Sequence, residues 1–314
     1  MAEKRIETKR LEADASGVSY AADILRAGGL VAFPTETVYG LGADATNGQA
    51  VAGIFEAKGR PSFNPLIVHV SGLEMAERYG VFSDVARAFV EMAWPDAVSV
   101  VVPLRPNSGL SELVTAGQNS VALRMPRSDI ALELLRTFGG PVAAPSANLS
   151  GKISPTSADH VLKGLDGRID AVIDGGPTPQ GLESTIIGFL EDPPVLYREG
   201  AFVDVPPEMV RKLDGESVPV TPGQLASHYA PKASLRLNAT EARGGEMLIG
   251  FGDVAGDLSL SLSGDLREAA ANLYALLHVA DERDVERVAV APIPNEGLGR
   301  AINDRLHRAA APRS

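Results

Sequence analysis

The sequence has no cysteine among its 314 residues. This excludes disulfides, thiolate nucleophiles and cysteine-ligated zinc or iron–sulfur centres. No apolar run approaches the ~20 residues needed to cross a bilayer, and the charged first residues lack the apolar core of a secretory signal. We therefore expect no membrane association and a cytoplasmic location.

The chain also lacks an excess of positive charge. Lys and Arg number 29 against 40 for Asp and Glu, so the net charge is −11, and the acidic excess holds on both sides of residue 200. A protein that binds nucleic acid mainly by neutralising phosphates is expected to carry a basic domain, so this class is disfavoured. The hydrophobic content of 45% is that of a folded protein, and the length predicts about two domains.

Several familiar site motifs are missing. The sequence has no GxxxxGK[ST] loop, no GxGxxG after a predicted strand, and neither HExxH nor GxSxG. The five His residues are scattered, and no pair has metal-ligand spacing. The sequence thus gives no support for a P-loop, a dinucleotide site, a hydrolase triad or a zinc enzyme.

Short Val/Ile/Leu runs alternate with helix-like stretches through the first 200 residues. Several runs are apolar at every position, which is typical of strands covered on both faces. The pattern predicts an α/β domain built on a twisted, mixed open sheet. The predicted strands are 30–33, 65–70, 98–104, 120–125, 141–144, 171–174, 184–188 and 195–198, and the predicted helices are 18–27, 49–57, 73–79, 84–93 and 130–138.

The rest of the chain reads as two further parts. Residues 201–231 are rich in proline with weak periodicity, which indicates a linker, but its His228-Tyr229 pair indicates that the linker packs onto something. From 232 to 314 the pattern restarts with strands at 246–251 and 287–291, each followed by a helix, at 266–279 and 298–309. This order predicts a small Rossmann-like domain.

Two segments near the start place hydroxyls and cations beside predicted strand ends. Residues 33–42 read FPTETVYGLG, in which Thr35 and Thr37 could line an anion-binding mouth or simply cap a turn. In KGRPSFNPLIVH, Lys58 and Arg60 are suited to a polyphosphate, although cations after a helix also complement its dipole. His69 in that segment is either a ligand-contacting group or a satisfied core residue.

Four later segments have the same chemical character. In SVALRMP, Arg124 lies in an apolar strand and must be ion-paired or contact a ligand. The segment APSANLSG supplies Ser146 and Asn148 as neutral hydrogen-bonding groups, unless it is an ordinary polar loop. The EST and REG segments add Ser184 and Arg198.

Taken together, these motifs resemble the YrdC-like family in its longer two-domain form, the threonylcarbamoyl-AMP synthases. The resemblance also rests on GQLASHYAP and on NEGLGRAINDRL, and it covers the chain from about residue 18. It implies a YrdC-like catalytic domain over 1–200, a linker over 201–231 that folds back over the active site, and a Rossmann-like domain over 232–314. The implied reaction converts L-threonine, bicarbonate and ATP to L-threonylcarbamoyl-AMP and pyrophosphate, the first step of threonylcarbamoyl-adenosine modification of tRNA.

The resemblance also assigns residues. Lys58 and Arg60 would be catalytic. ATP would be held by Lys58, Arg60, Asn64, Ser120, Ser146, Asn148, Ser154, Arg198 and Tyr229. Threonine would be held by Thr35 or Thr37, His69, Arg124, Ala144 and Ser184. Mg²⁺ is expected on the phosphates without a protein cage, and the product is expected to pass to a separate transferase, without direct binding of tRNA by this chain.

One departure and three alternatives remain. Where the family has a basic stretch before His-Tyr-Ala-Pro, this chain has Gln-Leu-Ala-Ser at 224–227, so a basic linker contact to phosphate is in doubt. The alternatives are an enzyme acting on another carbamoyl or acyl phosphate, an RNA-binding module without catalysis, and a protein that binds nucleotide without turnover.

Overall fold

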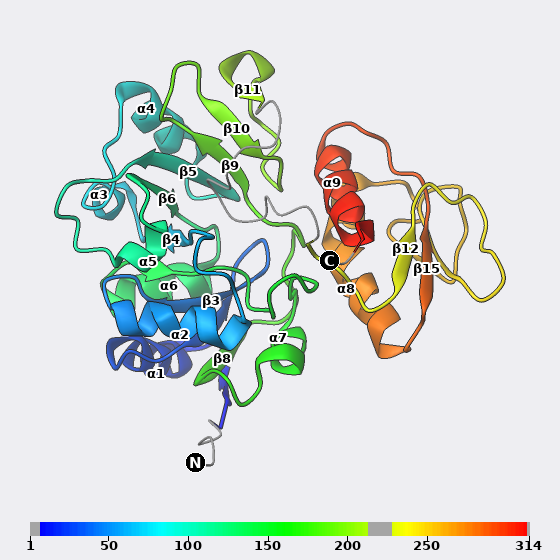
Figure 1. The fold of residues 1–314 in the computed structure, drawn as a ribbon, viewed down its shortest axis with the longest axis horizontal. Helices are drawn as coiled ribbons and strands as arrows, with labels where there is room; N and C mark the ends of the chain where they lie inside the picture. Colours follow the sequence, from blue (N-terminus) through cyan, green and yellow to red (C-terminus); the bar gives the residue numbers. More distant parts are fainter. Residues whose placement is uncertain (1–6, 213–227, 313–314) are drawn as a thin grey trace.

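The computed structural model describes residues 7–212 and 228–312, which form two α/β bodies, each around its own sheet (Figure 1). The division at 1–200, 201–231 and 232–314 stays a prediction. The Gln-Leu-Ala-Ser stretch at 224–227 lies outside the described residues.

The first body is built on a mixed sheet of eleven strands within the described residues, in the order β1-β8-β2-β3-β7-β4-β6-β5-β9-β10-β11. The sheet combines parallel pairs such as β4 with β6 and antiparallel pairs such as β5 with β6, which confirms the predicted mixed sheet. The strands are β1 (Lys9–Glu12), β2 (Val31–Pro34), β3 (Tyr39–Asp44), β4 (Ile67–His69), β5 (Val98–Pro103), β6 (Ser120–Arg124), β7 (Val142–Ala143), β8 (Ala171–Asp174), β9 (Thr185–Gly188), β10 (Val195–Arg198) and β11 (Arg211–Lys212).

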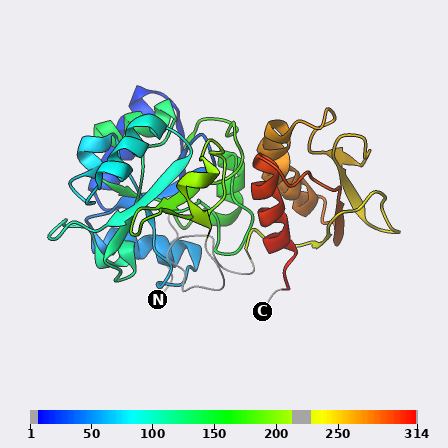
Figure 2. The ribbon, with the colours of Figure 1, turned by 90° about the horizontal axis from the view of Figure 1, so that it is seen from above.

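Helices cover both faces of this sheet, as Figures 1 and 2 show. The alternation along β2 assigns the faces: Val31 and Phe33 belong to the core beneath α1 and α6, whereas Ala32 belongs to the larger core beneath α2 and α4. The helices are α1 (Ala15–Arg26), α2 (Gly48–Lys58), α3 (Leu73–Ala76), α4 (Asp84–Ala93), α5 (Glu112–Thr115), α6 (Asp129–Phe138) and α7 (Ala158–Leu165), with a 3-10 turn η1 (Pro207–Met209) before β11.

The candidate site occupies the stretch of sheet that the α1 and α6 layer does not cover. On β6, Val121 and Leu123 enter the larger core, so Arg124 lies with Ala122 on the opposite face. The same face carries His69 of β4, which pairs with Arg124 in the parallel ladder. Strand alternation thus brings polar side chains onto one face while the other face is filled by apolar packing.

The second body, as far as residues 228–312 describe it, has a parallel sheet of four strands in the order β12-β15-β13-β14. Its elements are β12 (Ser234–Arg236), β13 (Met247–Gly250), β14 (Leu258–Ser259), α8 (Leu266–Glu282), β15 (Arg287–Val290) and α9 (Leu298–Ala310). The parallel sheet and the two long helices agree with the predicted Rossmann-like domain. Its apolar core also takes in Val38, Ile153 and Leu182 of the first body, so the two bodies share one packed interface.

Some elements differ from the sequence prediction. Residues Tyr39–Asp44 form strand β3, although their two glycines favour a turn. Glycine is required there because a Cβ at Gly42 would lie 2.9 Å from the Phe33 ring and from Val142. The short elements β1, β12, β14, α5 and α7 were also not predicted, and the helix expected over 73–79 ends at Ala76.

Candidate active site

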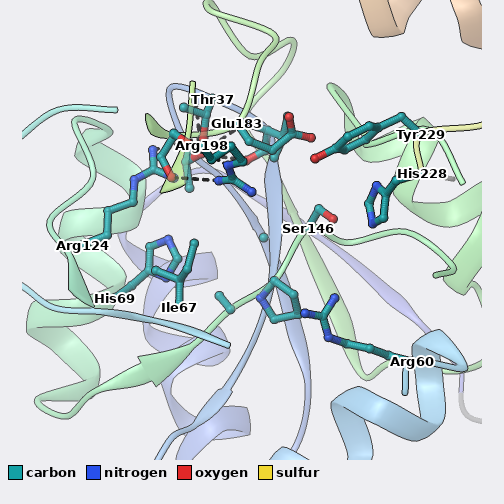
Figure 3. A pocket seen from close by; sticks show the side chains of 16 residues that line it. Thr37, Arg60, Ile67, His69, Arg124, Ser146, Glu183, Arg198, His228 and Tyr229 are labelled. Atoms are coloured by element: carbon teal, nitrogen blue, oxygen red, sulfur yellow. Dashed lines mark hydrogen bonds between the residues drawn. The ribbon is translucent and has the colours of Figure 1, made fainter. Parts of the chain in front are cut away.

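A pocket opens on the polar face of the large sheet, and its wall includes residues of the first body and of the segment that leads into the second (Figure 3). Arg124 and His69 lie on one side of it, while His228 and Tyr229 lie on the other. The lining residues are Thr35, Thr37, Val38, Gly40, Arg60, Ile67, His69, Arg124, Ala144, Pro145, Ser146, Glu183, Ser184, Arg198, His228 and Tyr229.

Arg124 forms the charged end of the predicted threonine side. Its Nη2 donates to Glu36 at 2.6 Å and to the Thr37 hydroxyl at 3.0 Å, and both members of the ion pair are almost fully buried. The Thr37 hydroxyl lies 2.8 Å from that of Thr35. Arg124 Nε has no hydrogen-bond partner within the described part of the chain. Arg124 is therefore ion-paired and also lines the pocket, while its contact with a ligand stays a prediction.

His69 lies beside Arg124 and is neutral. Burial, helped by the nearby Arg124 charge, lowers the pKa of His69 to about 3. The imidazole meets the Phe33 ring edge-on, with centroids 6.0 Å apart, and its Nδ1 has no hydrogen-bond partner among the residues described. His69 therefore lines the pocket with a buried nitrogen that no described residue satisfies.

The end of α2 supplies the two cations of the predicted phosphate side. Gly59, with φ of 59°, ends the helix and turns the chain so that Lys58 and Arg60 both point inward. Lys58 Nζ donates to the carbonyls of Ser146 and Asn148. Burial and the charge of Arg60 hold the pKa of Lys58 well below its usual value.

Arg60 itself lines the pocket. Its Nη2 donates to the Pro65 carbonyl at 3.0 Å, and burial lowers its pKa to about 10, so it stays charged near neutral pH. Asn64 lies behind it, with its carbonyl 3.4 Å from Arg60 Nε. The loop over residues 60–65 therefore holds the charged Arg60 guanidinium at the pocket wall.

The loop after β7 (Val142–Ala143) forms the wall between these two sides. Gly40 of β3 bridges to Ser146, and the amide of Ala147 donates to the Tyr39 carbonyl at 2.8 Å. Asn148 Nδ2 donates to the carbonyls of Leu149 and Lys152, which closes the loop on itself. Backbone pairing with β3 thus presents the Ser146 side chain to the pocket.

The segments around β9 and β10 add a third guanidinium group to the pocket wall, that of Arg198. Arg198 donates from Nε to the Ser184 carbonyl at 3.0 Å and from Nη2 to the Ser184 hydroxyl at 3.2 Å. A Cβ at Gly200 would come within 2.5 Å of the backbone of residues 183–185, so these two segments lie in direct backbone contact. Glu199, between them, pairs with Arg300 of α9 at 3.1 Å.

His228 and Tyr229 close the pocket on the side of the second body. The amide of Ala230 donates to the Gly151 carbonyl at 2.9 Å, and that of His228 donates to the Arg308 carbonyl at 3.3 Å. Tyr229 adopts φ of 63° and is almost fully buried. Burial lowers the pKa of His228 to about 3, so it too is neutral.

Ten of the fifteen residues assigned from the sequence line this pocket, and five do not. Lys58 and Asn148 act behind the wall, and Asn64 lies behind Arg60. Ser120 stands at the far end of β6 from Arg124, and Ser154 donates to Glu183. Which of these residues bind substrate stays a prediction.

Two buried carboxylates were missed by the sequence reasoning, namely Glu36 and Glu183. Each stands inside one of the motifs described above, between two Thr residues or directly before Ser184. The sequence feature that could have indicated them is the number of cations assigned to one pocket, because several buried cations require buried carboxylates as counter-charges. Within residues 7–212 and 228–312, no group of three or more His, Cys, Asp or Glu could hold a metal ion, and no helix is long and apolar enough to cross a membrane.

Comparison with known proteins decides the family. Residues 23–200 match the family of Sua5, YciO and YrdC, described as "Telomere recombination", and residues 195–311 match "Threonylcarbamoyl-AMP synthase, C-terminal domain". The chain belongs to the threonylcarbamoyl-AMP synthase family. A Bacillus subtilis member is 41% identical, with 98% of this chain and 96% of the relative covered, and a Schizosaccharomyces pombe member is 35% identical, with 94% and 88% covered.

A solved member of the family has the same fold. The crystal structure of P. abyssi Sua5 complexed with L-threonine superposes with a TM-score of 0.86 at 37% identity, covering 97% of both chains. The structure of a doubly alanine-substituted variant of P. abyssi Sua5 gives a TM-score of 0.87 at 35% identity, covering 96% of both chains. These matches confirm the predicted family and two-part α/β architecture.

Proposed function

We propose that this chain is an enzyme that makes L-threonylcarbamoyl-AMP and pyrophosphate from L-threonine, bicarbonate and ATP. The carrying observation is the pocket in which Arg60, Arg124 and Arg198 face one hollow across a hydroxyl-rich wall. An amino acid and a nucleoside triphosphate both present anionic groups, and three guanidinium groups in one pocket match that demand.

The threonine side of the pocket is the end at Arg124. A carboxylate that reaches Arg124 Nε finds a buried donor without a partner among the described residues, which supports assigning this group to the threonine carboxylate. The hydroxyls of Thr35, Thr37 and Ser184 and the neutral His69 surround it and supply hydrogen bonds without added charge. Ala144 lines the same wall and leaves room for a small side chain.

The ATP side of the pocket extends from Arg60 to Tyr229. Arg60 and Arg198 are assigned to the phosphates, Ser146 to a hydrogen bond from the wall, and Tyr229 to the cover over the nucleotide. Lys58 supports the same region by holding the loop at Ser146 and Asn148. Four residues that do not line the pocket remain assigned to the ATP side, namely Asn64, Ser120, Asn148 and Ser154.

The reaction needs alignment and charge neutralisation more than a proton relay. The threonine amine attacks CO₂ with loss of a proton, or bicarbonate with loss of water, to form a carbamate. A carbamate oxygen then attacks the α-phosphorus, and pyrophosphate leaves as the bond between the α- and β-phosphates breaks. Arg60 and Arg198 offset the charge that develops on the phosphates, while Arg124 binds the threonine carboxylate and so holds the carbamate in line with the α-phosphorus. His228 and Tyr229 exclude water from the reactive anhydride.

Magnesium enters with the nucleotide in this proposal. The described residues offer no cluster of carboxylates, and the Glu183 carboxylate already accepts bonds from Ser154, Tyr274 and Arg305. The donor set therefore suits an ion held by phosphate and water, which would neutralise the leaving pyrophosphate. The product would then pass in the cytoplasm to a separate transferase that modifies tRNA.

The test is pyrophosphate release together with the mass of the product from ¹³C-labelled bicarbonate. We expect release only when ATP, threonine and bicarbonate are all present, with the label retained in a threonylcarbamoyl adenylate. Release that ignores threonine or bicarbonate would indicate another acyl or carbamoyl phosphate substrate. Salt-sensitive RNA binding with no turnover would instead favour a binding module.

A further inference from the structure

Arg305 of α9 (Leu298–Ala310) reaches from the second body to a carboxylate of the pocket. Its Nε donates to Glu183 Oε2 at 2.9 Å, and its Nη2 donates to the Glu199 carbonyl at 2.9 Å. Only 1% of Arg305 is exposed, and Glu183 is 7% exposed. A buried ion pair that joins two bodies at the wall of a pocket links the packing of one body to the electrostatics of the other.

Tyr274 of α8 (Leu266–Glu282) completes the contact. Its hydroxyl donates to Glu183, with distances of 2.9 Å to Oε2 and 3.1 Å to Oε1, while Ser154 donates to Oε1 at 2.6 Å. Burial raises the pKa of Glu183, but the charges of Arg305 and Arg198 and the hydrogen bonds from Ser154 and Arg305 outweigh it and lower the pKa to about 2. Glu183 is thus a fixed anion in the pocket wall.

The same two residues also hold Tyr229. The Tyr229 ring stacks on that of Tyr274 with centroids 5.7 Å apart, and the Arg305 guanidinium lies 5.4 Å from the Tyr229 ring centroid. Tyr229 lines the pocket opposite Arg124 (Figure 3). Arg305 therefore touches both the anion of the pocket and the aromatic cover, without itself lining the pocket.

We infer that Arg305 and Tyr274 are positioning residues through which the second body sets the charge and shape of the nucleotide side. Arg305 neutralises Glu183, so that the charge of Arg60 and Arg198 remains available for an anionic ligand. Tyr274 holds the Tyr229 ring and orients the Glu183 carboxylate. This inference rests on the proposed function, since it takes the ligand on that side to be ATP.

The inference predicts opposite effects for the two members of the ion pair. Arg305→Met removes the directly paired counter-charge of Glu183, so the carboxylate draws on Arg198 beside the phosphates, and the KM for ATP should rise about tenfold or more. Glu183→Gln removes the repulsion and leaves a cation, so the KM for ATP should stay level or fall. The KM for threonine should change less than about twofold in both variants, because Arg124 lies at the other end of the pocket.

The experiment measures kcat and both KM values by pyrophosphate release, with the concentration of folded enzyme fixed by active-site titration. Arg300→Met is the matched control. It also removes a cation from α9, but Arg300 pairs with Glu199 and not with Glu183. The double variant Arg305→Met with Glu183→Gln should return the KM for ATP to within about threefold of the wild type. Tyr274→Phe, which keeps the ring stack, should raise the KM for ATP by a smaller factor and covers the case in which Arg305→Met does not fold.

Several outcomes would overturn the inference while the proposed function stands. One is a wild-type KM for ATP in Arg305→Met or Tyr274→Phe. Another is a fall in kcat of the same size in both variants with both KM values unchanged, which marks a merely structural role. A rise in the KM for ATP in Glu183→Gln that matches that in Arg305→Met would also refute it. If the wild-type chain releases no pyrophosphate, the proposed function itself fails.

Discussion

The ion pair between Arg124 and Glu36 offers the sharpest test of the threonine side. Arg124→Met removes the guanidinium but keeps most of the side-chain volume. The variant leaves Glu36 buried, 3% exposed, with no counter-charge in direct contact among the described residues. It also removes the group to which we assign the threonine carboxylate, so stability and substrate binding should both respond.

The magnitudes follow from the burial of the pair. Removing one member of a buried ion pair costs about 3–5 kcal/mol. At roughly 2 °C per kcal/mol for a chain of this size, the unfolding midpoint should fall by roughly 6–10 °C. A lost charge-assisted hydrogen bond is worth about 1.5–3 kcal/mol, which predicts a rise of about tenfold to a hundredfold in the KM for threonine.

The assay compares thermal unfolding and threonine titrations for Arg124→Met, for the double variant with Glu36→Gln, and for Arg127→Met. The double variant should recover most of the lost stability, because both charges are gone, but not the affinity for threonine. Arg127→Met removes an exposed cation of the neighbouring loop, whose ion pair with Asp96 should contribute less than about 1 kcal/mol. If Arg124→Met keeps the wild-type KM for threonine, the assignment of the threonine side is refuted.

Three further predictions concern phosphate chemistry, metal and pH. Lys58→Met should cut kcat about a hundredfold. Its far-ultraviolet circular dichroism should stay close to that of the wild type, which shows that the variant is folded. A fully active variant would overturn the catalytic role assigned to Lys58. Chelation of Mg²⁺ should abolish pyrophosphate release, and added Mg²⁺ should restore it. Burial lowers the pKa of His278 to about 3 and that of His160, stacked on it, to about 4. Both values lie below that of about 6.5 in the unfolded chain, so between these values the unfolded chain binds more protons than the folded one. The stability of the fold should therefore fall as the pH drops from about 6.5 to 4. The unfolding midpoints of wild type and His278→Gln at a pH of about 7 and of about 4.5 check this, because the variant should lose less than the wild type.

Much of the first body could be predicted because its strands are apolar on both faces. Strands β8 and β10 and helix α4 have the bounds that the sequence predicts. Strand β3 could not be predicted, since Gly40 and Gly42 have low strand propensity and are required only by packing against their neighbours, Phe33 among them. The short strands β1 and β14 carry too few apolar residues to be distinguished from loops.

The candidate site was predictable in its cations and hydroxyls but not in its anions. Arg60, Arg124 and Arg198 stand out because buried or loop-bound guanidinium groups demand a partner. Glu183 did not stand out, because its partners Tyr274 and Arg305 lie on helices 91 and 122 residues further along the chain, where Tyr and Arg are ordinary. Long-range pairing of this kind has no local sequence signal.

Each residue of the tripeptide Arg198-Glu199-Gly200 makes its own contact with a neighbouring part of the chain. Arg198 donates to Ser184, Glu199 pairs with Arg300 and Lys212, and Gly200 lies against the backbone of residues 183–185. Inserting a single residue here would displace all three contacts at once. The chain should therefore tolerate an insertion least just before residue 201. A chimera that takes its second body from another member of the family should accordingly keep residues 198–200 of this chain and join the new segment after them.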